Sequence, residues 1–272
     1  MDANLPIGAV PFDWTLTAPV DGAALQAELW HEGYFVDATP SLPPALVARC
    51  RAAIERVMGA GAPPLAAFAF DAPWELERRL LGHAAAAFDG EPAMLPAFWA
   101  WRLTREHARG WEPHRDRRAN PIDDRGAPLS ITLWCALTDA TTDNGCIHVL
   151  PAPLDVQYGN PRATAEALHL QCVRALPAPA GTVLGWTSAL LHWGGVARAG
   201  KAGRTSIAFE FQRAAQPPAD EPVYPRGWWP APADRRALIM RQWAQYEHMH
   251  ELPDEQRARL ETVLDELLSP RA

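Results

Sequence analysis

Two histidines and an aspartate are the residues of this chain whose types and spacing could bind a metal ion. His114 and Asp116 stand two apart in the segment Trp-Glu-Pro-His-Arg-Asp, and His192 follows far downstream in Leu-Leu-His-Trp-Gly-Gly. On an extended strand, residues two apart project to the same face, so His114 and Asp116 can face one ion while Arg115 points away. With His192 as third ligand, one side of the metal would stay open. This arrangement is typical of non-haem Fe(II) sites that react with O2.

The His-x-Asp pair alone is a weak signal, because such a pair also occurs in solvated loops and the chain has 9 histidines and 32 acidic residues. The downstream context strengthens it. Residues 182–186 and 205–212 both read as strands, and His192 lies between them. Arg204 immediately precedes the second strand, where its guanidinium can be held inside a barrel. Because an unpaired buried charge is costly, Arg204 there needs an anionic partner, and a carboxylate suits its two-pronged geometry.

With these residues in place, the chain resembles the phytanoyl-CoA dioxygenase family of Fe(II)- and 2-oxoglutarate-dependent oxygenases. The resemblance covers residues 20–215 and is sharpest over 111–212. It includes the family's strand–turn–strand signature, which runs here from 133 to 139 and from 143 to 151. The family implies a small-molecule substrate, such as an acyl, amino-acid-derived or natural-product compound.

The resemblance also implies roles for the co-substrates. In the family, 2-oxoglutarate and O2 take the open positions of the iron, and the products include succinate and CO2. Arg204 would pair with the remote C5 carboxylate of 2-oxoglutarate, and Trp134 would line the same site. Related halogenases lack the ligand carboxylate, so Asp116 favours hydroxylation, with desaturation or ring closure as variants.

One position departs from the family pattern. Family members often have a serine two residues after the distal histidine, where it contacts the co-substrate carboxylate, and this chain has Gly194 there. The contact is therefore absent or comes from another residue, with Ser206 and Thr132 as candidates. Asn144 corresponds to the asparagine of the family's Asn-Gly turn and is a candidate substrate residue.

Further candidate substrate contacts are aromatic and basic residues near the metal motif. Trp99 and Trp101 share one face of an expected strand, and small-molecule sites favour aromatic side chains, although most of the 12 tryptophans should be core residues. Several arginines crowd the motif and either balance nearby aspartates in a solvated loop or bind an anionic substrate group. Continued alternation places Arg118 on the face of His114 and Asp116, so Arg118 is the arginine expected to contact such a group.

The hydrophobic periodicity changes along the chain from helical to strand-like. Helices are expected over 19–33, 43–58 and 73–88, and Asp21 and Gly33 should cap the first. Short strand-like runs separated by turn residues follow at 97–104, 129–137, 146–150, 182–186, 189–193 and 205–212. Asp143-Asn-Gly145 is a strong hairpin signal between the second and third runs.

The remaining segments complete the expected architecture. Residues 152–180 read as a long loop over the barrel mouth, and two helices are expected over 232–250 and 253–268. The fold is therefore expected to be mainly β with flanking helices (α+β), with a double-stranded β-helix, or jelly roll, over about 95–214. The whole chain, 1–272, is expected to form one oxygenase domain.

Composition narrows the range of partners. The net charge of −7 argues against a nucleic-acid partner, which would favour a basic face. No apolar run approaches the roughly 20 residues that cross a bilayer, and the first residues lack the features of a signal peptide. A cytoplasmic protein that binds a small molecule is expected, as a monomer or a homodimer.

Two other classes of function remain open on the sequence. One is a jelly roll that binds a metal or ligand without turnover, although such a protein would usually have lost a member of the trio or Arg204. The other is a metal-dependent cupin-like enzyme that does not use 2-oxoglutarate, and Arg204 argues against it. Anaerobic addition of Fe(II) and 2-oxoglutarate would distinguish the three.

Overall fold

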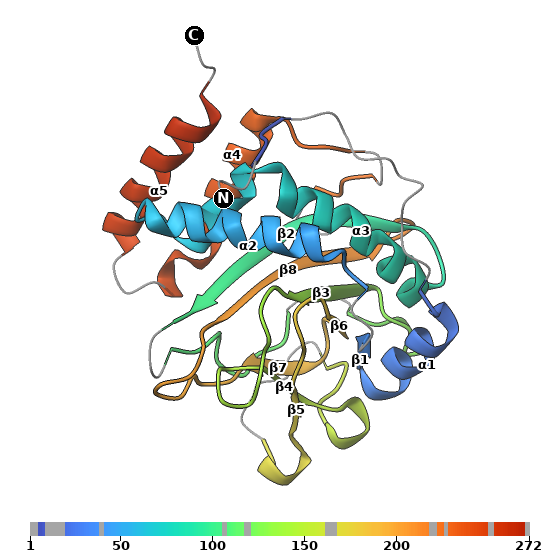
Figure 1. Ribbon diagram of the computed structural model, residues 1–272. Helices are drawn as coiled ribbons and strands as arrows, with labels where there is room; N and C mark the ends of the chain where they lie inside the picture. Colours follow the sequence, from blue (N-terminus) through green and yellow to red (C-terminus); the bar gives the residue numbers. More distant parts are fainter. Residues whose placement is uncertain are drawn as a thin grey trace.

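Two antiparallel sheets form the centre of the computed structural model, which describes residues 5–8, 20–37, 41–104, 108–116, 121–160, 168–217, 222–225, 228–249 and 253–269. The larger sheet has the strand order β1-β6-β3-β8-β2, with β1 at Tyr34–Asp37, β6 at Val183–Thr187, β3 at Ser130–Ala136, β8 at Arg204–Arg213 and β2 at Pro92–Leu103. The smaller has the order β5-β4-β7, with β5 at Arg174–Leu176, β4 at Ile147–Leu150 and β7 at Leu191–Gly194. The chain passes repeatedly between the two sheets (Figure 1), which confirms the expected jelly roll.

Side-chain alternation gives the larger sheet two different faces. On β3, Ile131, Leu133 and Cys135 join the main apolar cluster, whereas Thr132 and Trp134 line a cavity between the two sheets. The face of β3 is fixed by its pairing with β6 and β8 along its length. A slip of one residue would turn the apolar side chains into the cavity, so the buried face specifies the register.

Helices cover the outer face of the larger sheet (Figure 1). These helices and short 3-10 turns are α1 (Gly22–Glu32), α2 (Pro44–Gly59), η1 (Pro64–Ala69), α3 (Asp71–Phe88), α4 (Pro232–Tyr246), η4 (Glu247–Met249) and α5 (Pro253–Leu268). Phe68 and Trp74 from this layer are fully buried against Phe98 and Phe209 of the sheet. Each such side chain contributes about 1.5–3 kcal/mol by leaving water. Among the described residues, no helix has the length and apolar character needed to span a bilayer.

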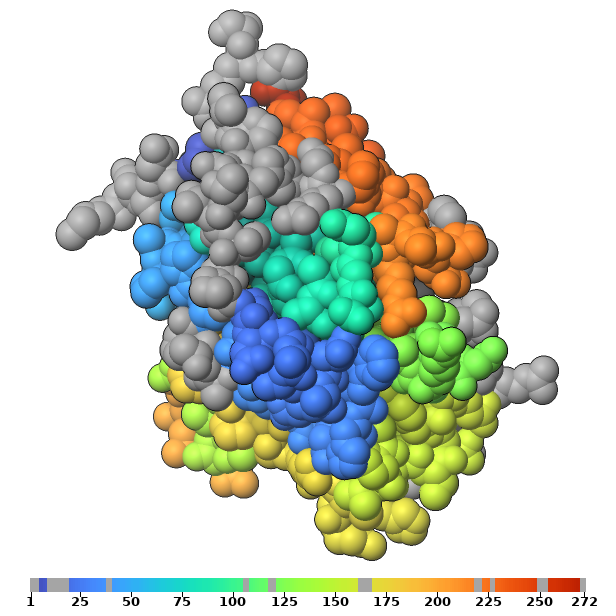
Figure 2. All heavy atoms as spheres, turned by 90° about the vertical axis from the view of Figure 1, so that its right-hand side faces the viewer, coloured from blue at the N-terminus to red at the C-terminus, as the bar shows by residue number. Residues whose placement is uncertain are grey.

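The first helix has the ends that the sequence predicts. The Asp21 side chain accepts a hydrogen bond from the Ala24 N–H at 3.2 Å, which satisfies one free donor of the first turn of α1. Gly33 ends the helix with a φ of 81°, a left-handed conformation that glycine adopts without strain. Figure 2 shows α1, in blue, lying against α3, in teal.

The hairpin prediction at Asp143–Gly145 is wrong. A turn is present, and Gly145 has a φ of 91°, but β3 and β4 belong to different sheets and do not pair. Residues 137–146 instead carry the chain from one sheet to the other, with Ala140 bridged to Ala178 on the way. The sequence signal identified the turn correctly, but local residue types do not specify which strands the turn connects.

The segment predicted as a long loop contains regular structure. In its described part, residues 152–160 and 168–180, the chain forms η2 (Ala152–Leu154), η3 (Leu170–Cys172) and β5. β5 pairs with β4 as an edge strand of the smaller sheet. Its three residues are too few to produce a readable alternation, which is why the sequence did not reveal it.

Candidate metal and co-substrate site

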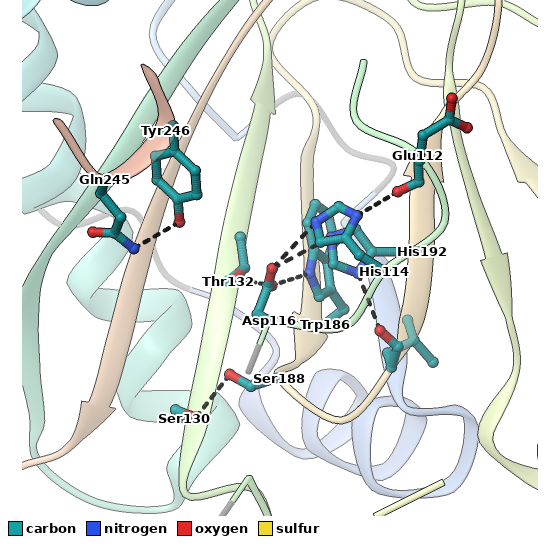
Figure 3. Close-up of polar contacts among 11 residues, drawn as sticks. Glu112, His114, Asp116, Ser130, Thr132, Trp186, Ser188, His192, Gln245 and Tyr246 are labelled. Carbon is teal, nitrogen blue, oxygen red and sulfur yellow. Dashed lines mark hydrogen bonds and ion pairs between the residues drawn. The ribbon is translucent and has the colours of Figure 1, made fainter. Parts of the chain in front are cut away.

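The three side chains proposed as metal ligands converge at one end of the cavity (Figure 3). His114 and His192 lie opposite each other in an antiparallel bridge, and the N–H of each donates to the carbonyl of the other at 3.0 and 2.9 Å. Asp116 Oδ1 lies 3.6 Å from the Nε2 atoms of both histidines. One ligand atom from each residue lies within 4.8 Å of the others, so the three can hold one ion together.

The histidine rings are oriented by backbone carbonyls. His114 Nδ1 lies 2.7 Å from the Glu112 carbonyl, and His192 Nδ1 lies 3.1 Å from the Leu190 carbonyl. Because a carbonyl only accepts, each Nδ1 carries the proton and each Nε2 keeps its lone pair. The lone pairs therefore face Asp116, in the tautomer that a metal ligand requires. The Nε2 of His114 is buried and has no hydrogen-bond partner among the described residues.

The two carboxylate oxygens of Asp116 have different partners. Its Oδ2 accepts hydrogen bonds from the Thr132 hydroxyl at 2.6 Å and from the Trp186 indole N–H at 2.9 Å (Figure 3). Its Oδ1 is left to face the two histidines. Trp186 ends an expected strand but is not among the predicted site residues, because no local sequence pattern shows which residue its N–H will contact.

Charges within the trio suit a metal ion. Burial lowers the pKa of His192 to about 4, so this ring is neutral at pH 7. Burial would raise the pKa of Asp116, but the two histidines and Thr132 outweigh it, and the pKa lies well below its usual range. Burial would lower the pKa of His114, but the neighbouring Asp116 carboxylate, 3.6 Å from its Nε2, outweighs burial and raises the pKa. A metal ion placed between these atoms would be attracted by the same carboxylate.

Two neutral imidazoles and one carboxylate, all with fixed outer hydrogen bonds, fit a divalent transition-metal ion. Water and carboxylates alone would suit Mg²⁺ or Ca²⁺ better. The open side of the trio faces the cavity, whose wall includes Trp134, Arg204 and several aromatic side chains. Ligands other than protein can therefore approach the ion from that side.

Trp186→Phe is expected to weaken metal binding about tenfold, because Asp116 loses one of the two donors that orient it. Titration of the metal-free protein with Co(II) measures this. Trp74→Phe is the matched control, since it removes an indole hydrogen bond of 2.7 Å to the Phe68 carbonyl, remote from the trio. It should lower stability and leave Co(II) affinity unchanged. An unchanged affinity in Trp186→Phe would mean that Thr132 alone orients the carboxylate.

Arg204 occupies the cavity wall beyond the trio. It is 1% exposed, donates from Nη1 to the Gly145 carbonyl at 2.7 Å and lies 5.6 Å from the centre of the Trp134 ring. Burial lowers its pKa to about 10, so it remains a cation at pH 7. None of the ion pairs between described residues includes Arg204. A buried guanidinium without a protein carboxylate can bind an anion, and its planar fork can contact a carboxylate at two points.

The structure explains why no serine stands at position 194. A Cβ added to Gly194 would lie 2.9 Å from the Cα of Gly110, closer than real Cβ contacts. A Cβ on Gly110 would in turn meet Gly194 at 3.1 Å. The two glycines therefore pack backbone against backbone beside Arg204, and a serine would force them apart.

The residues considered as replacements for that serine have different surroundings. Thr132 uses its hydroxyl to hold Asp116, so it supports the metal ligand. Ser206 lies two residues after Arg204 on the same face of β8, is fully buried, and its hydroxyl has no partner among the described residues. The indole N–H of Trp134 is likewise buried without a partner there. Ser206 and Trp134 thus retain donors for a ligand, and Thr132 does not.

An aromatic cluster forms another part of the cavity wall. Trp99 and Trp101, on one face of β2, have ring centres 6.2 Å apart, and both lie 5.5 Å from Trp111. Tyr246, from the end of α4, lies 4.7 Å from Trp111, which in turn is 5.4 Å from the His114 ring. Trp99 and Trp101 both line the cavity that the metal trio lines, and their contact with a substrate stays a prediction.

Glu210, Asn144 and Arg118 differ in how they are placed relative to the cavity. Glu210 of β8 lines it, and its negative charge contributes to the raised pKa of His114. The structure does not place Asn144 in the cavity wall. The Asn144 side chain accepts from the Thr141 N–H at 2.7 Å and donates to the Asp139 carbonyl at 2.9 Å, so it holds the crossing loop together. Arg118 lies outside the described residues, and its expected contact stays a prediction.

Comparison with known proteins gives one family match. A family model described as phytanoyl-CoA dioxygenase (PhyH) matches residues 65–205, just over half of the chain, and the match includes the metal trio and Arg204. A search of curated proteins found no significant match.

Solved structures share the fold at low sequence identity. AviO1 from Streptomyces viridochromogenes Tue57 is 24% identical, with a TM-score of 0.56 over 75% of this chain and 100% of that one. The epimerase SnoN, in complex with Fe3+, alpha ketoglutarate and nogalamycin RO, is 18% identical, with a TM-score of 0.55 over 76% and 87%. The carbocyclase SnoK, alpha ketoglutarate dependent, is 17% identical, with a TM-score of 0.56 over 76% and 88%.

Proposed function

Because this chain belongs to the phytanoyl-CoA dioxygenase family of non-haem iron- and 2-oxoglutarate-dependent oxygenases, we propose that it hydroxylates an unactivated carbon of a small molecule. The observation that carries the proposal is one cavity lined by both the oriented His-Asp-His trio and a buried arginine without a carboxylate partner. When bound, iron and 2-oxoglutarate supply an oxidant derived from O2 and release succinate and CO2. The protein contributes position, orientation and exclusion of water.

The trio has the role of holding the iron. His114, Asp116 and His192 present two nitrogens and one oxygen from two adjacent backbone segments, and each is fixed by a hydrogen bond on its far side. This preorganisation limits the reorganisation needed when the ion binds. The carboxylate of Asp116 also fills a position that would otherwise be open to another anion, which favours hydroxylation.

Arg204 has the role of binding the C5 carboxylate of 2-oxoglutarate. Ser206 and Trp134 supply further donors, since both keep a buried polar atom without a partner among the described residues. Hydrogen bonds to a charged carboxylate are stronger in a site that excludes water than on an exposed surface, so several such donors would bind the co-substrate tightly. These contacts would replace the one that the family serine makes elsewhere.

The aromatic cluster has the role of binding the body of the substrate. Trp99, Trp101 and Trp111 offer a large apolar surface beside the metal trio, which suits a ring or an alkyl group. Glu210 adds a carboxylate, and a carboxylate can accept several hydrogen bonds at once. This combination favours a substrate with a hydroxyl or amine donor.

Because Tyr246 of α4 lines the same cavity, we also propose that the whole chain acts as one domain.

Product analysis tests the proposed reaction. The iron-loaded enzyme is supplied with 2-oxoglutarate, 18O2 and a metabolite library, and compounds that stimulate succinate release are analysed by mass spectrometry. Hydroxylation predicts a product that has gained one labelled oxygen atom. A product of unchanged mass would indicate epimerisation, and one lacking two hydrogens would indicate cyclisation or desaturation. Binding of 2-oxoglutarate without any succinate release would support a non-catalytic jelly roll.

The substitutions Arg118→Ala and Glu210→Gln distinguish an anionic substrate from one that donates hydrogen bonds. If the substrate is anionic, the substrate KM rises in Arg118→Ala because its counter-charge is lost. If the substrate donates hydrogen bonds, the KM rises in Glu210→Gln because the amide is a weaker acceptor. Loss of a charged hydrogen bond corresponds to roughly tenfold or more in KM. Succinate formation without substrate should stay constant in the affected variant, and an unchanged KM in both would place recognition on the aromatic cluster alone.

A further inference from the structure

Arg115 stands between two of the metal-binding residues, yet its side chain points away from the metal site into a buried ion pair. The side chain of Arg115 is 9% exposed and that of its partner Asp155 is 3% exposed. Nη1 of Arg115 donates to Asp155 Oδ2 at 2.6 Å and to the Ala189 carbonyl at 2.6 Å. One nitrogen therefore joins three segments of the chain.

The carbonyl that Arg115 contacts belongs to the turn that positions the third ligand. Ala189 lies between β6 and β7 and immediately precedes Leu190, whose carbonyl orients the His192 ring at 3.1 Å. The backbone bridge between His114 and His192 joins the two ligand-bearing segments once. The guanidinium joins them a second time, one residue before the orienting carbonyl, and so restricts rotation of one segment against the other.

Asp155 is itself held in place, which fixes the guanidinium from its other side. Its Oδ1 accepts from the Gln157 N–H at 2.9 Å, and its backbone N–H donates to the Ala152 carbonyl at 3.2 Å. The same turn is anchored to the end of β6 by a hydrogen bond of 2.7 Å between the hydroxyls of Tyr158 and Thr187. The ion pair is thus connected to the backbone at both ends.

We propose that Arg115 and Asp155 are positioning residues for the iron site, a role that rests on the proposed function. They hold the segment of His114 and Asp116 against the turn before His192, so that the two Nε2 atoms and Oδ1 converge before the ion binds. Stability alone is a weak reason for such a pair, because apolar residues of similar volume often replace buried ion pairs without loss. Apolar side chains, however, could not make the directional hydrogen bonds by which Arg115 fixes the metal ligands relative to each other.

Titration of the metal-free protein with Co(II), followed by the visible bands of the bound ion, tests this role. Asp155→Asn keeps the shape and loses the charge, and we expect about tenfold weaker Co(II) binding and altered bands. Arg115→Lys should recover part of the affinity of Arg115→Met, because an ammonium can still donate to the Ala189 carbonyl. The double variant Arg115→Met/Asp155→Leu removes the charges together, so its melting temperature should approach that of the wild type while its Co(II) affinity stays low.

Arg174→Gln is the matched control. Arg174 also pairs with a carboxylate, Glu32 at 2.8 Å, and with a second acceptor, Tyr34 at 3.0 Å, but it lies on the exposed edge strand β5. Its Co(II) affinity should equal that of the wild type. Co(II) affinities within twofold of wild type in Asp155→Asn and in the double variant would overturn the positioning role. Failure of the wild type to bind Co(II), or full binding by His192→Ala, would instead contradict the proposed function itself.

Discussion

Asp116→Ala is expected to abolish substrate oxidation and to weaken iron binding by more than about a hundredfold. Loss of a residue that merely hydrogen-bonds a ligand costs roughly 10- to 100-fold in metal affinity, and here the ligand itself is lost. The variant also loses the negative charge that balances the ion and leaves Thr132 and Trp186 without their acceptor. Iron affinity and succinate release, measured on the same preparations, check the prediction.

Asp123→Ala is the control for this substitution. Asp123 lies in an exposed turn, where its Oδ1 accepts from the N–H groups of Arg125 and Ala127. It should lose some stability and keep full iron binding. Because Asp116→Ala removes a buried charge, its folding is verified by circular dichroism. Turnover at the wild-type rate in folded Asp116→Ala would mean that the trio does not hold the catalytic iron.

Arg204→Lys is expected to raise the KM for 2-oxoglutarate tenfold or more while iron affinity stays near that of the wild type. Lysine keeps the charge but presents a single point of contact, so the two-pronged interaction with the C5 carboxylate is lost. The loss corresponds to about 1.5–3 kcal/mol, the range for hydrogen bonds to charged groups. Steady-state kinetics at varied 2-oxoglutarate, with a parallel iron titration, measure both quantities.

Arg235→Lys is the control for Arg204→Lys, and it distinguishes an effect on co-substrate binding from an effect on fold stability. Arg235 is also fully buried, but it pairs with Asp71 at 2.6 Å and contacts the carbonyls of Ala69 and Pro230, between the helices. Its replacement should lower the melting temperature and leave the KM for 2-oxoglutarate unchanged. If both variants lose stability and neither changes this KM, Arg204 is a structural residue and another group binds the co-substrate.

Much of the fold and of the site could be predicted because the signals are periodic or rest on residue type. The family resemblance pointed to Trp134 and Arg204, and to Thr132 as a candidate, and all three line the cavity. The caps of α1 at Asp21 and Gly33 follow from local hydrogen bonding alone. A His-x-Asp pair, a distal histidine and an arginine together indicated the family, the enzyme class and the jelly-roll core. The family match and the two-sheet topology confirm these predictions.

The remaining features depend on contacts between segments far apart in the chain. The Trp186 hydrogen bond to Asp116 and the close packing of Gly110 on Gly194 both join segments whose proximity no local pattern specifies. The same limit explains the wrong hairpin at Asp143–Gly145. It also explains why the position of Asn144 differs from the expected one. The Asn144 side chain makes hydrogen bonds within its own loop and does not line the cavity.

An anaerobic spectroscopic titration tests whether one cavity holds iron on the His-Asp-His trio and 2-oxoglutarate on Arg204. Fe(II) is added to the metal-free protein, followed by 2-oxoglutarate, and the visible spectrum is recorded before and after O2. We expect a metal-to-ligand charge-transfer band that forms only with both components, is lost in His192→Ala, and disappears with O2 as succinate forms. Tight Fe(II) binding without this band at saturating 2-oxoglutarate would show that 2-oxoglutarate does not bind to the iron held by the trio.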